Sequence, residues 1–266
     1  MIRPILSHIG LILACAIVLG PIIWVFRTSL VPEHLSYSTD LLPGMTLDNY
    51  RTLLAEKDFA GNYINSLIVA ILSVVLSMPL AALTGYAFAR FRTGGRFARF
   101  ATLASQMLPP VALALPVFML YRSIGLTNSL TGLVIVYAAI NLPFLTWILM
   151  GFFEAIPPDL DGAAMTDGAT RWGAFWRIVL PVALPGIMAA GVLGFILSWN
   201  EFLFALILGG SSTATVPVAL ASLQTSNGVE ISMVSAGVSL AILPLLVAMR
   251  FIQKYLVQGL SFGSVK

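Results

Sequence analysis

Charged residues are scarce in this chain of 266 residues: aspartate, glutamate, lysine and arginine together make up 9% of it. Soluble domains carry about 25%. Hydrophobic residues make up 59%, and the mean hydropathy is +0.96. This is more apolar surface than a soluble globule of this size needs, so we expect the bilayer to be the solvent. The length suits one membrane domain of several helices, without a separate soluble catalytic domain of roughly 100 residues.

Cysteine and histidine are almost absent. Cys15 is the only cysteine and lies in an apolar run, so we expect a small buried hydrophobe rather than a redox residue. The two histidines, His8 and His34, are isolated from each other and form no metal-binding pattern with Cys15. The motifs GxxxxGK[ST] and HExxH do not occur. We therefore expect no catalytic residue, no metal site and no ATP or other cofactor bound by this chain.

Six apolar runs are long enough to cross about 30 Å of hydrocarbon as helices. They predict an all-α membrane protein with six transmembrane helices in a single domain, 1–266. The predicted spans are 5–26, 63–88, 101–121, 131–153, 186–208 and 232–252. A cleaved signal peptide is the alternative for the first run, but that run is long for one and lacks a clear small-x-small cleavage site.

The basic residues are unevenly distributed between the two sides that these spans define. Of the 14 lysines and arginines, ten fall on the side of the two termini and four on the other. The ten are Arg3, Arg90, Arg92, Arg96, Arg99, Arg171, Arg177, Arg250, Lys254 and Lys266, and the four are Arg27, Arg51, Lys57 and Arg122. Positive charge favours the cytoplasm, so both termini are predicted to be cytoplasmic. Binding of anionic lipid is the alternative role for the cluster at 90–99.

The polar segment 154–185 interrupts the apolar sequence and carries helix signals of its own. Asp159 follows two prolines and is predicted to cap a helix over 160–167. Gly168 stands where a helix end favours a positive φ. We predict that this segment forms two short helices at a steep angle, presented to a partner.

The second of these helices is predicted over 171–179, with Pro181 and Pro185 stopping it. Ile178 and Leu180 are expected to pack the segment against the spans. Since the predicted topology places the segment on the cytoplasmic face, the partner is expected to be cytoplasmic.

This segment resembles the EAA loop of ABC importer permeases, whose pattern is E-A-A, three residues, G, nine residues, I, one residue, L-P. The matching residues are Ala163, Ala164, Gly168, Ile178, Leu180 and Pro181. The chain departs from the pattern at Gly162, which replaces the family's glutamate, and Asp161 precedes it. The usual carboxylate contact is then either absent or made by Asp161.

The resemblance extends over nearly the whole chain and is closest to the MalG-like permeases of ABC sugar importers. It is carried by SWNEFLFALIL at 198–208, VPVALASLQ at 216–224, GLSFGSVK at 259–266, and LDNYRTLL at 47–54 with NSLIVA at 65–70. It implies a type I importer fold in the bacterial inner membrane. It also implies a second homologous permease, an ATPase dimer that binds ATP and Mg²⁺, a periplasmic solute-binding protein and surrounding membrane lipid, with no nucleic acid.

The resemblance assigns two sets of residues to the ATPase interface. The coupling set is Asp161, Gly162, Ala163, Ala164, Met165, Asp167, Gly168, Ala169 and Pro181. The C-terminal set is Gly263, Ser264, Val265 and Lys266.

A few polar side chains interrupt the apolar runs. Glu201 lies in the fifth predicted span after Trp199 and Asn200, and Asn65 and Asn141 lie in two others. A charge within a span usually faces a bundle interior or a water-filled path, and an aromatic face with polar groups suits a sugar. These five residues are candidates for the substrate pathway; interhelical hydrogen bonds or contacts with the partner permease are the alternative. A secondary transporter is the alternative function, although no inverted repeat is found.

Overall fold

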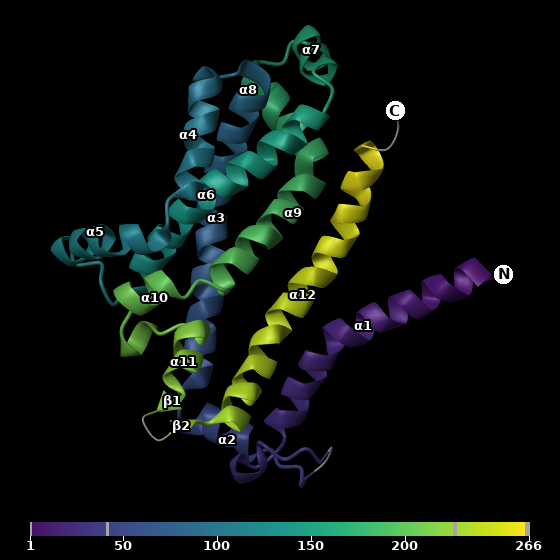
Figure 1. Ribbon diagram of the computed structural model, residues 1–266. Helices are drawn as coiled ribbons and strands as arrows, with labels where there is room; N and C mark the ends of the chain where they lie inside the picture. Colours follow the sequence, from purple (N-terminus) through teal and green to yellow (C-terminus); the bar gives the residue numbers. More distant parts are fainter. Residues whose placement is uncertain (1, 41–42, 226–227, 264–266) are drawn as a thin grey trace. The chain divides into compact units, whose positions relative to one another are not determined.

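The computed structural model describes residues 2–40, 43–225 and 228–263. The described chain is helical apart from a short hairpin of β1 (Gln224–Thr225) and β2 (Gly228–Val229), which confirms the all-α prediction (Figure 1). Within these described residues, five helices are long and apolar enough to cross a membrane, or six if one bent pair counts as a span. The chain divides into two compact units, Met1–Tyr63 with Val216–Pro244 and Ile64–Thr215 with Leu245–Lys266.

The first unit holds the polar segment that follows the first apolar helix. It contains α1 (Ile2–Ser29), η1 (Glu33–Leu35), α2 (Asp48–Ala55), α11 (Val216–Ser222) and the start of α12 (Ile231–Gly263). Glu33 accepts hydrogen bonds from the backbone N–H groups of Ile231 (2.9 Å) and Ser232 (2.8 Å), so it caps α12. The Asn49 amide donates to the carbonyls of Ser29 (2.9 Å) and Val31 (2.8 Å).

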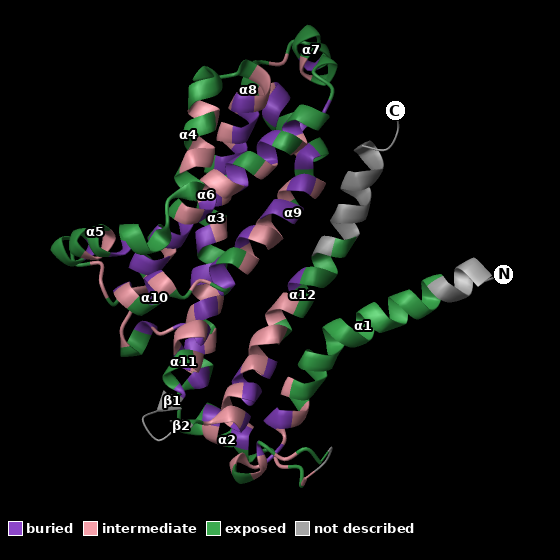
Figure 2. Cartoon of the chain, viewed as in Figure 1, coloured by how far each residue is buried: buried purple, intermediate pink, exposed green. Residues whose placement is uncertain are grey.

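The second unit holds the remaining helices around a core of apolar side chains. Its elements are α3 (Phe59–Phe91) from Ile64 on, α4 (Gly95–Met107), α5 (Pro110–Ser123), α6 (Leu130–Ala155), α7 (Asp159–Thr166), α8 (Arg171–Ala174), the π-helical turn η2 (Phe175–Val179), α9 (Leu180–Trp199), α10 (Leu203–Leu208), η3 (Ser211–Thr213) and the part of α12 from Leu245 on. Leu145, Leu149 and Phe153 of α6 pack with Phe175 and Val179 in the centre of this core. Figure 2 shows buried residues on α3, α6 and α9, whereas α1 is exposed along most of its length.

Helices α3 and α6 touch backbone to backbone at Gly85. A Cβ atom added there would lie 3.0 Å from the Met150 amide nitrogen and 3.1 Å from the Thr146 carbonyl oxygen. Membrane helices approach closely where small residues remove side-chain bulk. The sequence therefore needs glycine at this position to bring the two helices together.

The third predicted span, 101–121, is not one helix. Helices α4 and α5 are bent by 91° relative to each other, with a break at Leu108 and Pro109. Leu108 is extended because a proline disfavours the helical conformation of the residue before it. Pro110 begins α5, where a missing N–H costs nothing.

The fifth predicted span, 186–208, has different limits in the structure. A helical path runs without interruption over Arg171–Trp199 and ends before Glu201. The prediction that Pro181 and Pro185 stop the helix is wrong. Pro181 lies in the first turn of α9, after the π-helical turn, where its missing donor is tolerated. Pro185 lies inside α9, as prolines often do in membrane helices.

Candidate functional site

Helix α7 is short, stands between α6 and α8, and holds most of the predicted coupling residues (Figure 1). Its N-cap is Pro158, and the structure records no side-chain hydrogen bond at this cap among the residues it describes. The predicted cap by Asp159 is therefore wrong, because Asp159 is itself the first helical residue. Gly168 has φ +87°, as expected at the end of a helix. Its N–H donates to the Met165 carbonyl at 3.1 Å, so the turn after α7 is defined.

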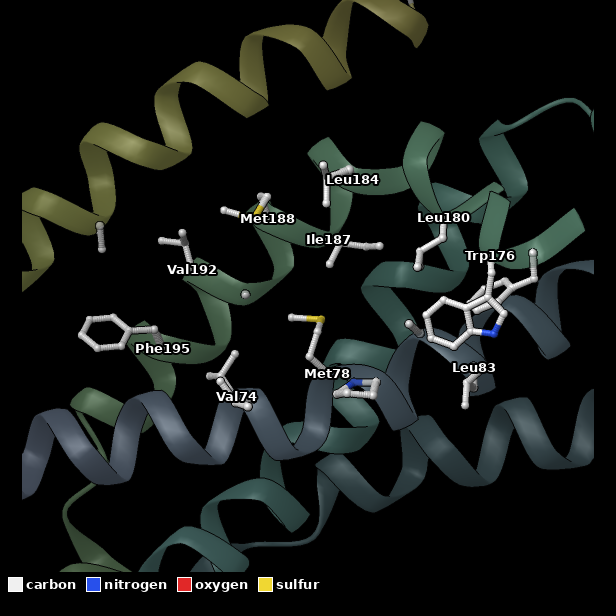
Figure 3. Close-up of a pocket in the computed structure, with 16 residues that line it drawn as sticks. Val74, Met78, Leu83, Trp176, Leu180, Leu184, Ile187, Met188, Val192 and Phe195 are labelled. Atoms are coloured by element: carbon white, nitrogen blue, oxygen red, sulfur yellow. The ribbon is translucent and has the colours of Figure 1, made fainter. Parts of the chain in front are cut away.

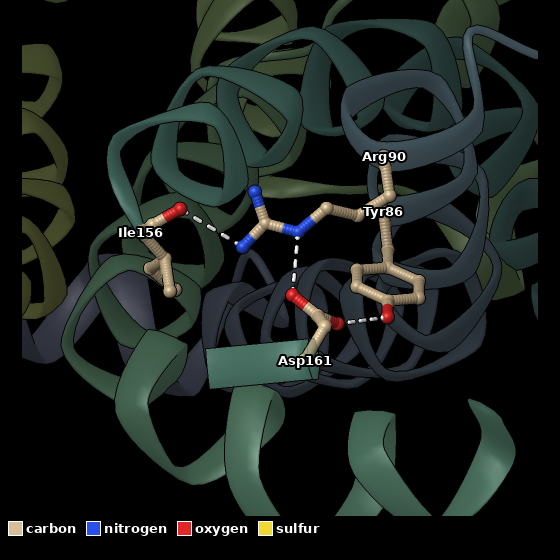
Figure 4. Close-up of polar contacts among 4 residues, drawn as sticks. All are labelled: Tyr86, Arg90, Ile156 and Asp161. Atoms are coloured by element: carbon tan, nitrogen blue, oxygen red, sulfur yellow. Dashed lines mark hydrogen bonds and ion pairs between the residues drawn. The ribbon is translucent and has the colours of Figure 1, made fainter. Parts of the chain in front are cut away.

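A buried ion pair connects α7 to α3. Nε of Arg90 lies 2.8 Å from Oδ2 of Asp161, and the two side chains are 8% and 13% exposed. Nη2 of Arg90 also donates to the Ile156 carbonyl at 2.9 Å, and the Tyr86 hydroxyl donates to Oδ1 of Asp161 (Figure 4). We call Tyr86, Arg90, Ile156 and Asp161 the α3–α7 anchor. Asp161 therefore makes a carboxylate contact within its own chain.

Aromatic packing surrounds the anchor. The Tyr86 ring lies 4.8 Å from that of Phe175 and 5.6 Å from that of Phe153, measured between ring centroids. The sequence predicts a role in membrane topology for Arg90 and gives no role to Tyr86. The signal that was available is their spacing, since residues i and i+4 share one face of a helix.

The side of α7 that faces away from the anchor carries small residues. Gly162 and Ala163 are exposed, whereas Ala164 is 7% exposed and packs inward. Met165 is also exposed, but it lies on the anchor side, where it lines a small pocket with Asp161. A Cβ atom added at Gly162 would meet no atom within 4 Å in the described part of the chain. The family's glutamate position is thus open on the outside of the helix. Backbone and small side chains of α7 are free to approach another surface closely.

The other predicted coupling residues lie around α7 and along the next helix. Asp167 and Pro181 are exposed, and Ala169 is half-buried. The Thr170 hydroxyl accepts from the Gly173 N–H at 3.1 Å and caps α8. The prediction that Ile178 packs inward is wrong, because it is 37% exposed. Leu180 does pack against the core, together with Phe175 and Val179.

Asn141 belongs to a polar cluster buried between three helices. It is 1% exposed, and its amide donates to Oγ of Ser198 at 2.7 Å. The Ser198 hydroxyl lies 3.0 Å from that of Ser73, so the cluster links α6, α9 and α3. Ser73 and Ser198 are not among the residues predicted from the sequence. Asn65 lies elsewhere on α3, and its amide donates to the carbonyls of Ser212 and Ala214, each at 3.1 Å.

Glu201 lies in the break between α9 and α10, not inside a helix. Its two carboxylate oxygens accept from the N–H groups of Phe204 (3.0 Å) and Ala205 (3.2 Å) and cap α10. Asn200 is exposed and donates to the Ile196 carbonyl at 2.8 Å. Trp199 is buried and stacks on Phe195 at 5.8 Å.

An apolar groove of about 540 Å³ runs between α3 and α9 (Figure 3). Val74, Met78 and Leu83 line it from α3, and Ile187 and Val192 line it from α9. None of the five predicted pathway residues lines this groove in the described part of the chain. A sugar needs hydrogen-bonding partners for its hydroxyl groups, so the walls of this groove do not suit one.

The C-terminal contact set cannot be placed as a whole. Gly263 is the last residue of α12, and Ser264, Val265 and Lys266 lie outside the described residues. Among the residues that the structure describes, no group of three or more histidine, cysteine, aspartate or glutamate side chains is arranged to hold a metal ion.

Comparison with known proteins adds sequence and structural relatives. The sequence profile of the family described as "Binding-protein-dependent transport system inner membrane component" matches residues 77–262. The trehalose transport system permease protein SugB of Mycobacterium tuberculosis is 36% identical over 251 residues, which cover 92% of each chain. The trehalose/maltose transport system permease protein MalG of Thermococcus litoralis is 33% identical over 272 residues, covering 100% of this chain and 98% of the relative.

Solved structures share the fold. A chain from a bacterial ABC transporter involved in the import of the acidic polysaccharide alginate superposes with a TM-score of 0.76. The two sequences are 24% identical, and the match covers 96% of each chain.

Proposed function

The chain belongs to the family of binding-protein-dependent transport system inner membrane components, and on this premise we propose that it carries a sugar, a sugar derivative or a polyol into the cytoplasm. It is a multi-pass permease of the inner membrane, and ATP hydrolysis falls to a partner ATPase. The proposed mechanism is alternating access driven by that ATPase. Rigid-body movement of the helices opens the substrate cavity first to one side of the membrane and then to the other.

The substrate class rests on the relatives. Full-length relatives at 33–36% identity are permeases for trehalose or for trehalose and maltose, and another, 34% identical, is a permease for diacetylchitobiose. These substrates are all small saccharides. We propose the same chemical class here.

The proposed assembly has this chain beside a second homologous permease, with an ATPase dimer on the cytoplasmic side and a periplasmic solute-binding protein on the other. Both termini are proposed to be cytoplasmic because of the distribution of basic residues. The observation that carries the ATPase contact is the geometry of α7: its outer face at Gly162 and Ala163 is small and open, and its inner face is held by a buried ion pair. Gly263 to Lys266 are proposed as a second ATPase contact.

The proposed substrate pathway has five candidate residues, Asn65, Asn141, Trp199, Asn200 and Glu201. The geometry favours the packing alternative for Glu201 and Asn141. Both Glu201 oxygens accept from backbone N–H groups of α10, and Asn141 donates to a serine of a neighbouring helix. Asn200 is the exposed member of the set, so its side chain is the most accessible to a solute.

Reconstitution with and without the ATPase tests the proposed function. The tagged chain is co-expressed with the products of its neighbouring genes, purified in mild detergent and placed in liposomes. We expect an ATPase and a second permease to co-purify, and uptake of a labelled disaccharide to require both ATP and the binding protein. Uptake by this chain alone, without ATP, would make it a secondary carrier.

A further inference from the structure

We propose that the ion pair of Asp161 and Arg90 transmits movement of α7 to α3, so that docking and transmission use different residues of the same short helix. This inference rests on the proposed function, because it assumes that an ATPase moves α7. Docking belongs to the open face at Gly162 and Ala163, and transmission belongs to Asp161 on the opposite, inner side.

Both carboxylate oxygens of Asp161 have partners inside the chain. Oδ2 pairs with Nε of Arg90 at 2.8 Å, and Oδ1 accepts from Tyr86. With 13% of its side chain exposed, Asp161 offers little to a partner protein. Since Gly162 has no side chain, the carboxylate that the family's pattern has at this position is missing here, and the carboxylate one residue earlier points inward.

The connection between α6 and α7 is held by Arg90. Arg90 binds Asp161 through Nε and the carbonyl of Ile156, at the end of α6, through Nη2 at 2.9 Å. One guanidinium therefore holds both sides of the connection 156–158 between α6 and α7. Charge-assisted hydrogen bonds are about twice as strong as neutral ones, and the fixed geometry of the guanidinium limits rotation. These hydrogen bonds consequently oppose bending of the connection as a hinge.

Beyond the anchor, α3 contacts α6 and α9. One residue before Tyr86, Gly85 lies against the backbone of α6 at Met150 and Thr146, so α3 and α6 move together there. About 20 Å further along the helix, at 1.5 Å per residue, Ser73 joins the buried cluster with Ser198 and Asn141. A displacement of α7 thus reaches the contacts between α3, α6 and α9.

The test measures docking and transport separately in the complete reconstituted complex. In Asp161→Asn we expect the amount of co-purified ATPase to stay the same, while ATP-driven uptake falls at least tenfold and more ATP is hydrolysed per solute transported. Asp159→Asn is the matched control, because it makes the same change at an exposed position of the same helix. That control should transport at the normal rate.

A second variant covers the case in which Asp161→Asn does not reach the membrane. Tyr86→Phe removes only the hydroxyl that donates to Asp161, and we expect a loss of uptake of a few fold at normal ATPase binding. Normal uptake in both variants, or loss of the ATPase together with uptake, would overturn the inference. If the unmodified chain binds no ATPase, the proposed function itself fails, whatever these variants do.

Discussion

Gly85 of α3 lies against the backbone of Met150 in α6, at a distance that leaves no room for a side chain. In Gly85→Ala the new Cβ would meet backbone atoms of α6, which cannot rotate away. We therefore expect a lower unfolding temperature in detergent and several-fold less protein in the membrane. Overpacking of this kind typically costs about 1–3 kcal/mol.

The control for this change is Gly151→Ala. An added Cβ at Gly151 meets no atom within 4 Å among the described residues, so this variant should behave like the unmodified chain. Equal stability of the two variants would mean that α3 and α6 are not as closely packed as described.

Ser198→Ala tests the buried polar cluster. The substitution removes the acceptor of the Asn141 amide at 2.7 Å and leaves that amide buried. A buried unsatisfied donor costs about 1–3 kcal/mol, so we expect a drop of several degrees in the unfolding midpoint. Ser123→Ala, at an exposed serine, is the control and should leave the midpoint unchanged. An unchanged midpoint in Ser198→Ala would argue against the cluster.

Glu201 separates a structural role from a substrate contact. As a cap of α10, it should be replaceable by glutamine, which keeps an oxygen acceptor, but not by alanine, which loses about 1 kcal/mol. We expect Glu201→Gln to transport with normal KM and Glu201→Ala to be less stable. An increase of tenfold or more in KM for Glu201→Gln, at normal stability, would instead assign the carboxylate to the substrate pathway.

Gly168→Pro should abolish transport while the protein still inserts into the membrane. Proline fixes φ near −65°, whereas Gly168 has φ +87°, so the turn after α7 cannot form. Gly168→Asn is the control, since asparagine enters the left-handed region more readily than other side chains. Uptake is compared at equal membrane abundance, and a normal rate in Gly168→Pro would contradict the coupling role of α7.

Local signals predicted much of this fold. The position of the loop helix and the glycine at its end follow from residue type and spacing, and Gly168 has the expected conformation. Proline was a less reliable signal. Pro109 and Pro110 separate two helices, whereas Pro181 and Pro185 do not. Pro181 follows a π-helical turn and lies in the first turn of α9, and Pro185 lies inside that helix.

Contacts between distant residues were beyond the sequence pattern. Arg90 and Asp161 are separated by 71 positions, and nothing in either neighbourhood identifies the other. The sequence does contain a signal for the break before α10. Glu201 is a carboxylate within an apolar run, and its oxygens can accept from the backbone N–H groups at the start of a helix that follows. The prediction placed it inside a continuous span, 186–208.

Site-specific crosslinking from α7 tests the central claim most directly. Cys15 is the only cysteine, so Cys15→Ala gives a background in which single cysteines can be introduced. We predict that Ala163→Cys crosslinks to the co-purified ATPase with a short thiol reagent, and that Ser123→Cys, on the predicted periplasmic side, does not. An Ala163→Cys variant that transports normally but never crosslinks to an ATPase would contradict the assignment of α7 as the coupling helix.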